Sequence, residues 1–217
     1  MPIQASASTT FLGWHARACV GVARHRSAFT LIELLLVVVI VGIVAAALIP
    51  QLTSDVPSRL DAASQIVVAD LDYGRALAVA NNSKYRFTFQ PANNRYYLQH
   101  SGTNTLLNTL PRSPFRQNND TADKQTTDIA KLPLPAPTVS LIAVVRMQSG
   151  GQSTTEIEFT PLGSTTSTYE TDLWLTCGSG NSQRYISVIV NPVTGLTSIG
   201  PLQSALPAAV QSIVSGS

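Results

Sequence analysis

One apolar stretch, residues 29–49, constrains this chain more than any other part of its sequence. Fifteen of its 21 residues are Phe, Leu, Ile or Val, and its one charged side chain is Glu33. As a helix rising about 1.5 Å per residue it would be about 31 Å long, close to the roughly 30 Å hydrocarbon core of a bilayer. These side chains contribute about −4.5 to −9 kcal/mol to insertion, whereas a central carboxylate costs about 2.5–3.5 kcal/mol. We therefore predict a transmembrane helix at 29–49, in which an acid invites a functional explanation.

The 28 residues before this stretch are basic. They contain Arg17, Arg24 and Arg26 and no acidic residue, and positive charge before a spanning helix keeps that end in the cytoplasm. Without these residues the formal charge changes from +2 to −1, because 11 basic and 12 acidic side chains remain. A chain with that charge has no long-range field that attracts a polyanion such as DNA.

The residues at the start of the apolar stretch, Ser27-Ala28-Phe29-Thr30-Leu31-Ile32-Glu33-Leu34-Leu35, resemble the prepilin cleavage and methylation motif of type IV pilins and type II secretion pseudopilins. The resemblance implies a leader peptide at 1–28, cleavage by a prepilin peptidase between Ala28 and Phe29, and N-methylation of Phe29. The family usually has Gly before the cut. Because Ala is the next smallest residue, we expect cleavage to survive at a lower rate. The resemblance also implies that Glu33 meets the amine of a neighbouring subunit's Phe29 during assembly.

A conventional secretory signal peptide is the main alternative for this region. Ala45-Ala46-Ala47 is similar to a signal peptidase site, and a soluble β-protein would then be secreted. The apolar stretch is longer than the usual 7–15 residues and contains an acid, which argues against this alternative. The leader is long for a prepilin, so the position of the start codon stays open.

A second helical segment is predicted across residues 50–83, after the helix-breaking Pro50 and around Pro57. Its small and apolar residues recur at spacings of three and four and would form one face. Its charged residues fall mostly off that face and comprise Arg59, Asp61, Asp70, Asp72 and Arg75. The predicted face comprises Leu60, Ala63, Val67, Leu71, Gly74 and Ala78.

The apolar pattern changes to a period of two after residue 84, which is typical of strands. A hairpin is predicted at 85–99, followed by strands at 139–146, 155–160, 172–177, 185–190 and 196–199. This order predicts an α+β fold, in which a long amino-terminal helix precedes a small antiparallel β-sandwich spanning 84–200. Two polar or uncharged segments are predicted to lie outside the sheets: an exposed loop at 101–137 and a frayed tail at 201–217.

The order of parts also resembles the GspH/FimT-type group of minor pseudopilins. The resemblance rests on three segments: Ala69-Asp70-Leu71 with Gly74-Arg75-Ala76-Leu77-Ala78, then Glu158–Gly163, then Tyr185–Val190 with Gly195. Some members of this group bind DNA through arginines near the carboxyl terminus. Here Gly195-Leu196-Thr197 stands at that place, and residues 191–217 contain no Lys or Arg. A DNA-binding role in natural transformation is therefore a minor alternative.

We expect no enzyme activity, cofactor or metal site. His100 is predicted to be a solvent-facing loop residue, and Glu156 and Glu158 are predicted to be solvated on the outer face of a strand. Cys177 is expected to be a small buried residue. Neither the histidine nor the glutamates have the neighbours that a metal site or a catalytic pair requires.

The resemblance implies a structural subunit of a type II secretion system or of a type IV pilus-like filament. Its single span would lie in the bacterial inner membrane, with the amino terminus cytoplasmic and the domain beyond residue 50 periplasmic. Its expected partners are the prepilin peptidase and other subunits, with secreted cargo as a further candidate and DNA as an unfavoured one.

Overall fold

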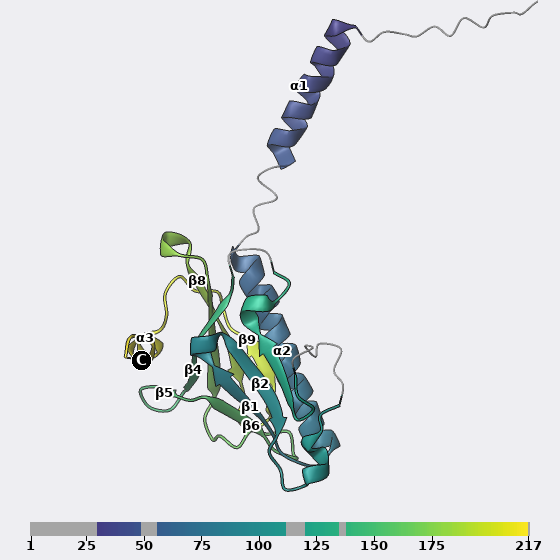
Figure 1. Ribbon diagram of the computed structural model, residues 1–217. Helices are drawn as coiled ribbons and strands as arrows, with labels where there is room; N and C mark the ends of the chain where they lie inside the picture. The colour runs from purple at the N-terminus through teal and green to yellow at the C-terminus, as the bar shows by residue number, and fades with distance from the viewer. Residues whose placement is uncertain (1–29, 49–55, 112–119, 135–137, 217) are drawn as a thin grey trace, which may run out of the picture. The chain divides into compact units, whose positions relative to one another are not determined.

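The computed structural model describes residues 30–48, 56–111, 120–134 and 138–216, and the chain divides into two compact units, residues 1–50 and 51–217. The described part of the first unit is one helix, α1 (Leu31–Leu48). The described part of the second unit contains helices α2 (Val56–Ala80) and α3 (Ala208–Ser215) together with nine strands (Figure 1).

Helix α2 forms as its spacing predicts. All six residues of the predicted apolar face are buried. Pro57 lies in the first turn, where its missing amide breaks no helical hydrogen bond. The helix ends at Ala80, and Asn82 then adopts a left-handed φ of 46° that reverses the chain. Two of the charged residues, Arg59 and Asp70, are nevertheless buried, at only 5% and 7% exposed.

One sheet has four antiparallel strands in the order β3-β2-β1-β6. The predicted hairpin is confirmed: Phe87 of the first strand lies opposite Leu98 of the second and, on its other side, opposite Ile157. Its connection ends at Asn94, whose φ of 50° suits a tight reversal. The strands are β1 (Tyr85–Gln90), β2 (Arg95–His100), β3 (Lys124–Asp128) and β6 (Glu156–Phe159).

The other sheet has five antiparallel strands in the order β5-β4-β7-β8-β9. A register shift between Leu141 and Ala143 interrupts the pairing of β4 with β7. The strands are β4 (Ser140–Arg146), β5 (Gln152–Ser153), β7 (Thr171–Cys177), β8 (Arg184–Val190) and β9 (Thr197–Ile199). The strands predicted beyond residue 138 all form, within one or two residues at their ends, and the α+β prediction is confirmed.

Helix α2 joins the two sheets into one core, because it contacts β1 and β6 of the first sheet and β7, β8 and β9 of the second. It lies alongside the strands in Figure 1. Gly74 is where the helix comes closest, since a Cβ there would collide with the ring of Phe87. The centre of the core is aromatic and comprises Phe87, Phe89, Tyr96 and Phe159, each at most 1% exposed.

The predicted loop at 101–137 is wrong in part. Lys124–Asp128 forms the edge strand β3, paired with β2, and Leu110 and Ile129 are buried. The five residues Lys-Gln-Thr-Thr-Asp have no alternating apolar pattern, so the sequence did not predict this strand. Backbone pairing and side-chain hydrogen bonds hold it instead. Residues 112–119 and 135–137 of the predicted loop lie outside the described residues.

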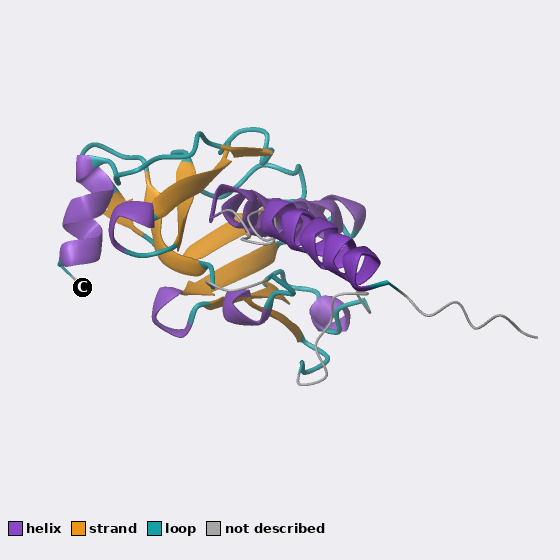
Figure 2. Cartoon of the chain, turned by 90° about the horizontal axis from the view of Figure 1, so that it is seen from above, coloured by secondary structure: helices purple, strands orange, loops and turns teal. Residues whose placement is uncertain are grey.

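The prediction of a frayed tail at 201–217 is also wrong. Residues 208–215 form α3, which lies beside the strands at the carboxyl-terminal end of the chain (Figure 2). Val210 is fully buried and packs in a second apolar cluster with Ala143, Val145 and Trp174. The few apolar side chains of this segment are enough to hold the helix on the sheet, because the outer face of β4 and β7 is itself apolar at this position.

Candidate assembly segment and surface sites

Glu33 lies in the first turn of α1. The side chain of Thr30 accepts a hydrogen bond from the Glu33 amide at 3.3 Å, and the Thr30 carbonyl accepts bonds from the amides of Glu33 and Leu34. Thr30 thus begins the helix as a hydroxyl cap does. A carboxylate in the first turn also interacts favourably with the positive end of the helix dipole.

The surface of α1 is apolar on every side. Its described aliphatic side chains are between 50% exposed, at Val44, and 83% exposed, at Leu31. The helix contains 18 residues and is about 27 Å long. A helix that is hydrophobic all round is one that other material normally covers. Of the helices in the part of the chain that is described, none combines the length and apolarity needed to cross a membrane.

Of the three predicted processing and assembly residues, the structure describes Glu33. Ala28 and Phe29 lie outside the described residues, as do the leader at 1–28 and positions 49–55. Cleavage at Ala28, methylation of Phe29 and the span 29–49 therefore stay predictions.

His100 is buried, so its prediction as a solvent-facing loop residue is wrong. It is the last residue of β2 and is 8% exposed. One ring nitrogen lies 2.7 Å from the Ser83 hydroxyl and the other 2.8 Å from the Asn108 side-chain oxygen. The ring packs edge-on against Tyr85, its partner in the β1–β2 register. Because the strand continues one residue further than its apolar pattern suggests, His100 joins the interior and ties residues 83 and 108 to the sheet.

Glu156 and Glu158 lie on the outer face of β6, as predicted, but they are not equally solvated. The Glu158 side chain is 13% exposed and pairs with Arg86 at 2.9 Å and with Lys84 at 3.5 Å. Burial raises the pKa of Glu158, but the Arg86 hydrogen bond and nearby positive charges outweigh this effect and lower it overall. Glu156, which is 48% exposed, pairs with Arg86 at 3.3 Å. The arrangement stabilises the β1–β6 pair.

The three segments behind the GspH/FimT-type resemblance meet at Arg75. The Arg75 Nε donates to the carbonyl of Gly163 at 3.0 Å and to that of Thr194 at 2.9 Å. Gly163 and Gly195 have φ angles of 81° and 64°, and a Cβ on Gly195 would collide with the Gly163 carbonyl. Helix α2, the β6–β7 loop and the β8–β9 turn are therefore fastened together at one point. The sequence identified these residues without indicating that they touch.

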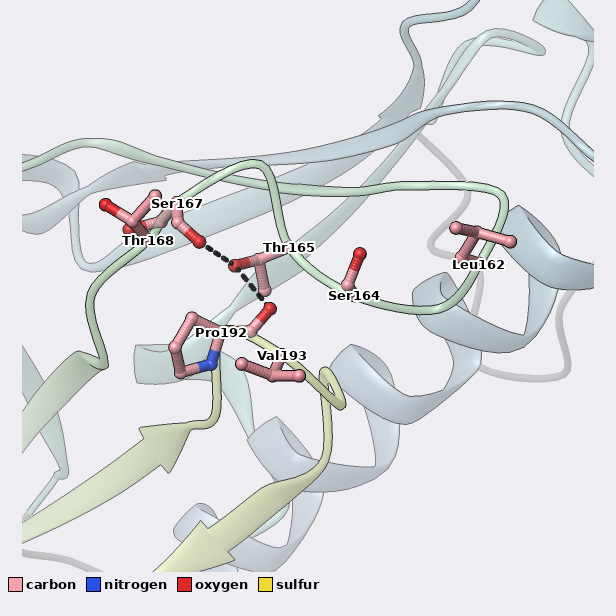
Figure 3. Close-up of a pocket in the computed structure, with 7 residues that line it drawn as sticks. All are labelled: Leu162, Ser164, Thr165, Ser167, Thr168, Pro192 and Val193. Atoms are coloured by element: carbon pink, nitrogen blue, oxygen red, sulfur yellow. Dashed lines mark hydrogen bonds between the residues drawn. The ribbon is translucent and has the colours of Figure 1, made fainter.

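A pocket of about 430 Å³ lies beside this junction. Figure 3 shows the β6–β7 loop opposite the turn that carries Pro192 and Val193; the lining residues of the loop are Leu162, Ser164, Thr165, Ser167 and Thr168. The Thr165 hydroxyl donates across the gap to the Pro192 carbonyl at 3.3 Å. Leu162 and Val193 are 91% and 78% exposed. The lining thus offers hydroxyl and apolar groups but no titratable side chain. In the described parts of the chain, no group of three or more His, Cys, Asp or Glu could hold a metal ion.

Comparison with known proteins finds the prokaryotic N-terminal methylation motif at residues 23–49. Two crystal structures of the type IV minor pilin FimU of Pseudomonas aeruginosa (strain PAO1) are similar, each with 15% sequence identity. The first has a TM-score of 0.40 and covers 70% of this chain and 95% of its own. The second has a TM-score of 0.39 and covers 69% and 98%. No curated protein matches the sequence.

Proposed function

We propose that the chain is a type IV pilin-like, non-catalytic structural subunit of a filament, because it carries the prokaryotic N-terminal methylation motif at residues 23–49. The filament is a type II secretion pseudopilus or a type IV pilus-like fibre. The observation that carries the proposal is the extent of the motif, which includes all of α1, a helix that is mainly apolar and at least half exposed along its described aliphatic residues. Such a surface requires a partner.

We propose that maturation proceeds as the motif implies. A prepilin peptidase cleaves between Ala28 and Phe29, the new amino terminus is methylated, and the segment around α1 anchors the subunit in the bacterial inner membrane with the domain beyond residue 50 in the periplasm. Assembly then exchanges the contacts of α1 with lipid for contacts with the same helix of other subunits. The hydrophobic effect does not drive this exchange, because lipid tails are as apolar as the helix. Close packing of small or complementary surfaces drives it instead.

Glu33 sets the register in this scheme. A carboxylate in a medium of low dielectric constant is costly unless an opposite charge neutralises it. The methylated amine of a neighbouring subunit's Phe29 supplies that charge, and it can do so at one axial position only. The pair therefore selects one stagger between helices whose remaining surface is nearly uniform.

The domain beyond residue 50 would supply contacts to other subunits or to secreted cargo. The alternative of DNA binding is less favoured, since residues 191–217 contain no basic side chain and the processed chain has a formal charge of −1. Secretion with an ordinary signal peptide is less favoured because the methylation motif spans the same residues.

The test compares Glu33→Val with Glu33→Asp in the full chain, expressed in a bacterium with a prepilin peptidase and partner subunits. Both variants should insert and be cleaved. Incorporation of Glu33→Val into sheared filaments should fall at least about tenfold, which corresponds to about 1.4 kcal/mol. Glu33→Asp keeps the charge and should retain much of the incorporation.

Mass spectrometry of the mature amino terminus supplies the second measurement. A terminus at N-methyl-Phe29 supports the proposed processing, whereas a terminus near Leu48 would show that a signal peptidase acts instead. Unchanged incorporation of Glu33→Val would refute the role of the carboxylate in register.

A further inference from the structure

Asp70 places a carboxylate at the wall of a cavity. The residue lies on α2 and is 7% exposed. Its Oδ2 accepts two hydrogen bonds, from the Tyr96 hydroxyl at 2.7 Å and from the Thr127 hydroxyl at 2.8 Å. No described residue donates a hydrogen bond to its Oδ1, and the side chain lines a cavity of about 270 Å³. Oδ2 thus accepts two hydrogen bonds, whereas Oδ1 has no hydrogen-bond partner among the described residues.

The remainder of the cavity wall is mainly apolar. Helix α2 contributes Ile66 and Ala69, and the segment after β3 contributes Leu132 and Pro133. Lys131 also lines the cavity, but its ammonium pairs with Asp128 at 3.1 Å, and its side chain is 72% exposed. The site is therefore a small apolar chamber with one acid whose charge the nearest lysine does not neutralise.

The electrostatics of Asp70 agree with this geometry. Burial raises the pKa of Asp70, and the hydrogen bonds from Tyr96 and Thr127 lower it by less, so the net shift is upward. Tyr96 and Thr127 alone therefore do not fully compensate the charged form for its burial. A cationic group entering the chamber would regain that lost solvation and pair with Oδ1.

We propose that this cavity binds a primary alkylammonium group, either a free aliphatic amine or the lysine side chain of another protein. The ammonium would donate a charge-assisted hydrogen bond to Asp70 Oδ1, and the methylene stem would lie against Ile66, Leu132 and Pro133. A volume of about 270 Å³ lies just below the usual range of small-molecule sites, about 300–1,000 Å³, and suits a group the size of one side chain.

Other ligand classes fit the chamber less well. A carboxylate or phosphate would meet the charge of Asp70, and a purely apolar ligand would leave Oδ1 unpaired. A guanidinium group pairs best with two carboxylate oxygens at once, but Oδ2 is already engaged by Tyr96 and Thr127. An ammonium needs only one free acceptor, because it is a compact point charge.

The experiment uses the full chain in nonionic detergent and follows the methyl NMR signals of Ile66 and Leu132. Titration with n-butylammonium chloride should shift these signals in a saturable way, and n-butanol, of similar size but uncharged, should bind at least about tenfold more weakly. Asp70→Asn keeps an oxygen that can accept from Tyr96 and Thr127 but removes the charge, so it should abolish this preference. Asp61→Asn, an exposed acid on the same helix, is the matched control and should keep it.

A second variant covers the case in which Asp70→Asn perturbs the fold. Ala69 is exposed and lines the cavity, so Ala69→Leu should fold normally and abolish saturable binding. Equal binding of butanol and butylammonium, absence of saturable binding, or an unchanged preference in Asp70→Asn would overturn the proposal.

The two sources of the ligand are separated with Nα-acetyl-lysine methylamide. Binding of this compound supports a lysine side chain, whereas binding of butylammonium alone supports a free amine. All of these titrations are made on unassembled protein, so their outcome is independent of the filament proposal, which stands or fails on Glu33.

Discussion

Helices α1 and α2 are separated by only a few residues in the sequence, but their apolar side chains differ in exposure. The aliphatic side chains of α1 are at least 50% exposed over its described length, whereas the predicted face of α2 is buried against both sheets. The difference follows from pattern, since α1 is apolar all round and α2 alternates apolar and polar residues at helical spacing. Helix α2 is thus stabilised by packing inside its own unit, whereas no other described part of the first unit covers α1.

The largest expected effect tests whether the two helices are energetically independent. Phe87 is 1% exposed at the centre of the aromatic core, so Phe87→Ala should lower the unfolding free energy of the second unit by about 3–5 kcal/mol. Leu36→Ala on α1, where the side chain is 55% exposed, should change it by less than about 0.5 kcal/mol.

Both unfolding free energies can be measured by urea titration of the processed chain in detergent. After removal of the leader, which contains Trp14, the single tryptophan is Trp174, which is 2% exposed and reports on the second unit. A loss of more than 1 kcal/mol in Leu36→Ala would contradict the comparison, because it would mean that α1 stabilises the second unit.

The parts of the fold that the sequence predicted are those in which apolar periodicity specifies burial. The α2 face and the alternating strands β1, β2 and β6 are examples, because each buried position repeats with the element's own period. Strand β3 and helix α3 were missed. Strand β3 is held by backbone pairing and by Thr127 rather than by an apolar face, and α3 packs through Val210, Ile213 and Val214 against a small cluster on the second sheet. Such non-local contacts leave little trace in local sequence.

The candidate sites divide in the same way. Glu33 was found from a motif whose residues are contiguous. Asp70 was missed because it was counted with the charged residues mostly off the apolar face, although it lies three residues after Val67 and four before Gly74 of that face. His100 was missed because its partners Ser83 and Asn108 are brought to it by the hairpin and a loop. Sequence pattern can indicate that a polar residue is buried, but the partners that satisfy it come from the fold.

A second prediction concerns the cost of burying a carboxylate inside the second unit. Asp172 on β7 is 6% exposed, and its Oδ1 has no hydrogen-bond partner in the described structure. Burial, helped by the charge of Glu170, raises the pKa of Asp172 to about 6. Because the folded chain holds this proton more tightly than the unfolded chain, stability should fall as pH rises from about 4 to about 6.

A pKa raised from 3.8 to about 6 corresponds to at most about 3 kcal/mol of stability, and we expect a loss of about 1–2 kcal/mol because the carboxyl is partly solvated. The unfolding free energy of Asp172→Asn, relative to that of the unmodified chain, should therefore be higher at pH 7.5 than at pH 4 by that amount. Urea unfolding at the two pH values measures it. Asp61→Asn, at an exposed position, serves as the control and should show no such pH-dependent gain. If Asp172→Asn raised the unfolding free energy equally at both pH values, the gain would come from packing and not from removal of the charge.

The smallest expected effect, at Arg75, asks whether the second unit contributes to assembly alongside α1. Arg75→Ala removes the hydrogen bonds to Gly163 and Thr194 and should cost about 1 kcal/mol, with faster amide exchange confined to the β6–β7 loop and the β8–β9 turn. Arg75→Lys keeps the charge but has no donor at the Nε position, so it should recover little of this loss. Filament incorporation should stay near that of the unmodified chain, because the proposed assembly uses α1. If incorporation fell as far as it does in Glu33→Val while the loss of stability stayed near 1 kcal/mol, the loops fastened by Arg75 would themselves be an assembly surface. The contrast between a self-sufficient second unit and a partner-dependent α1 would then no longer hold.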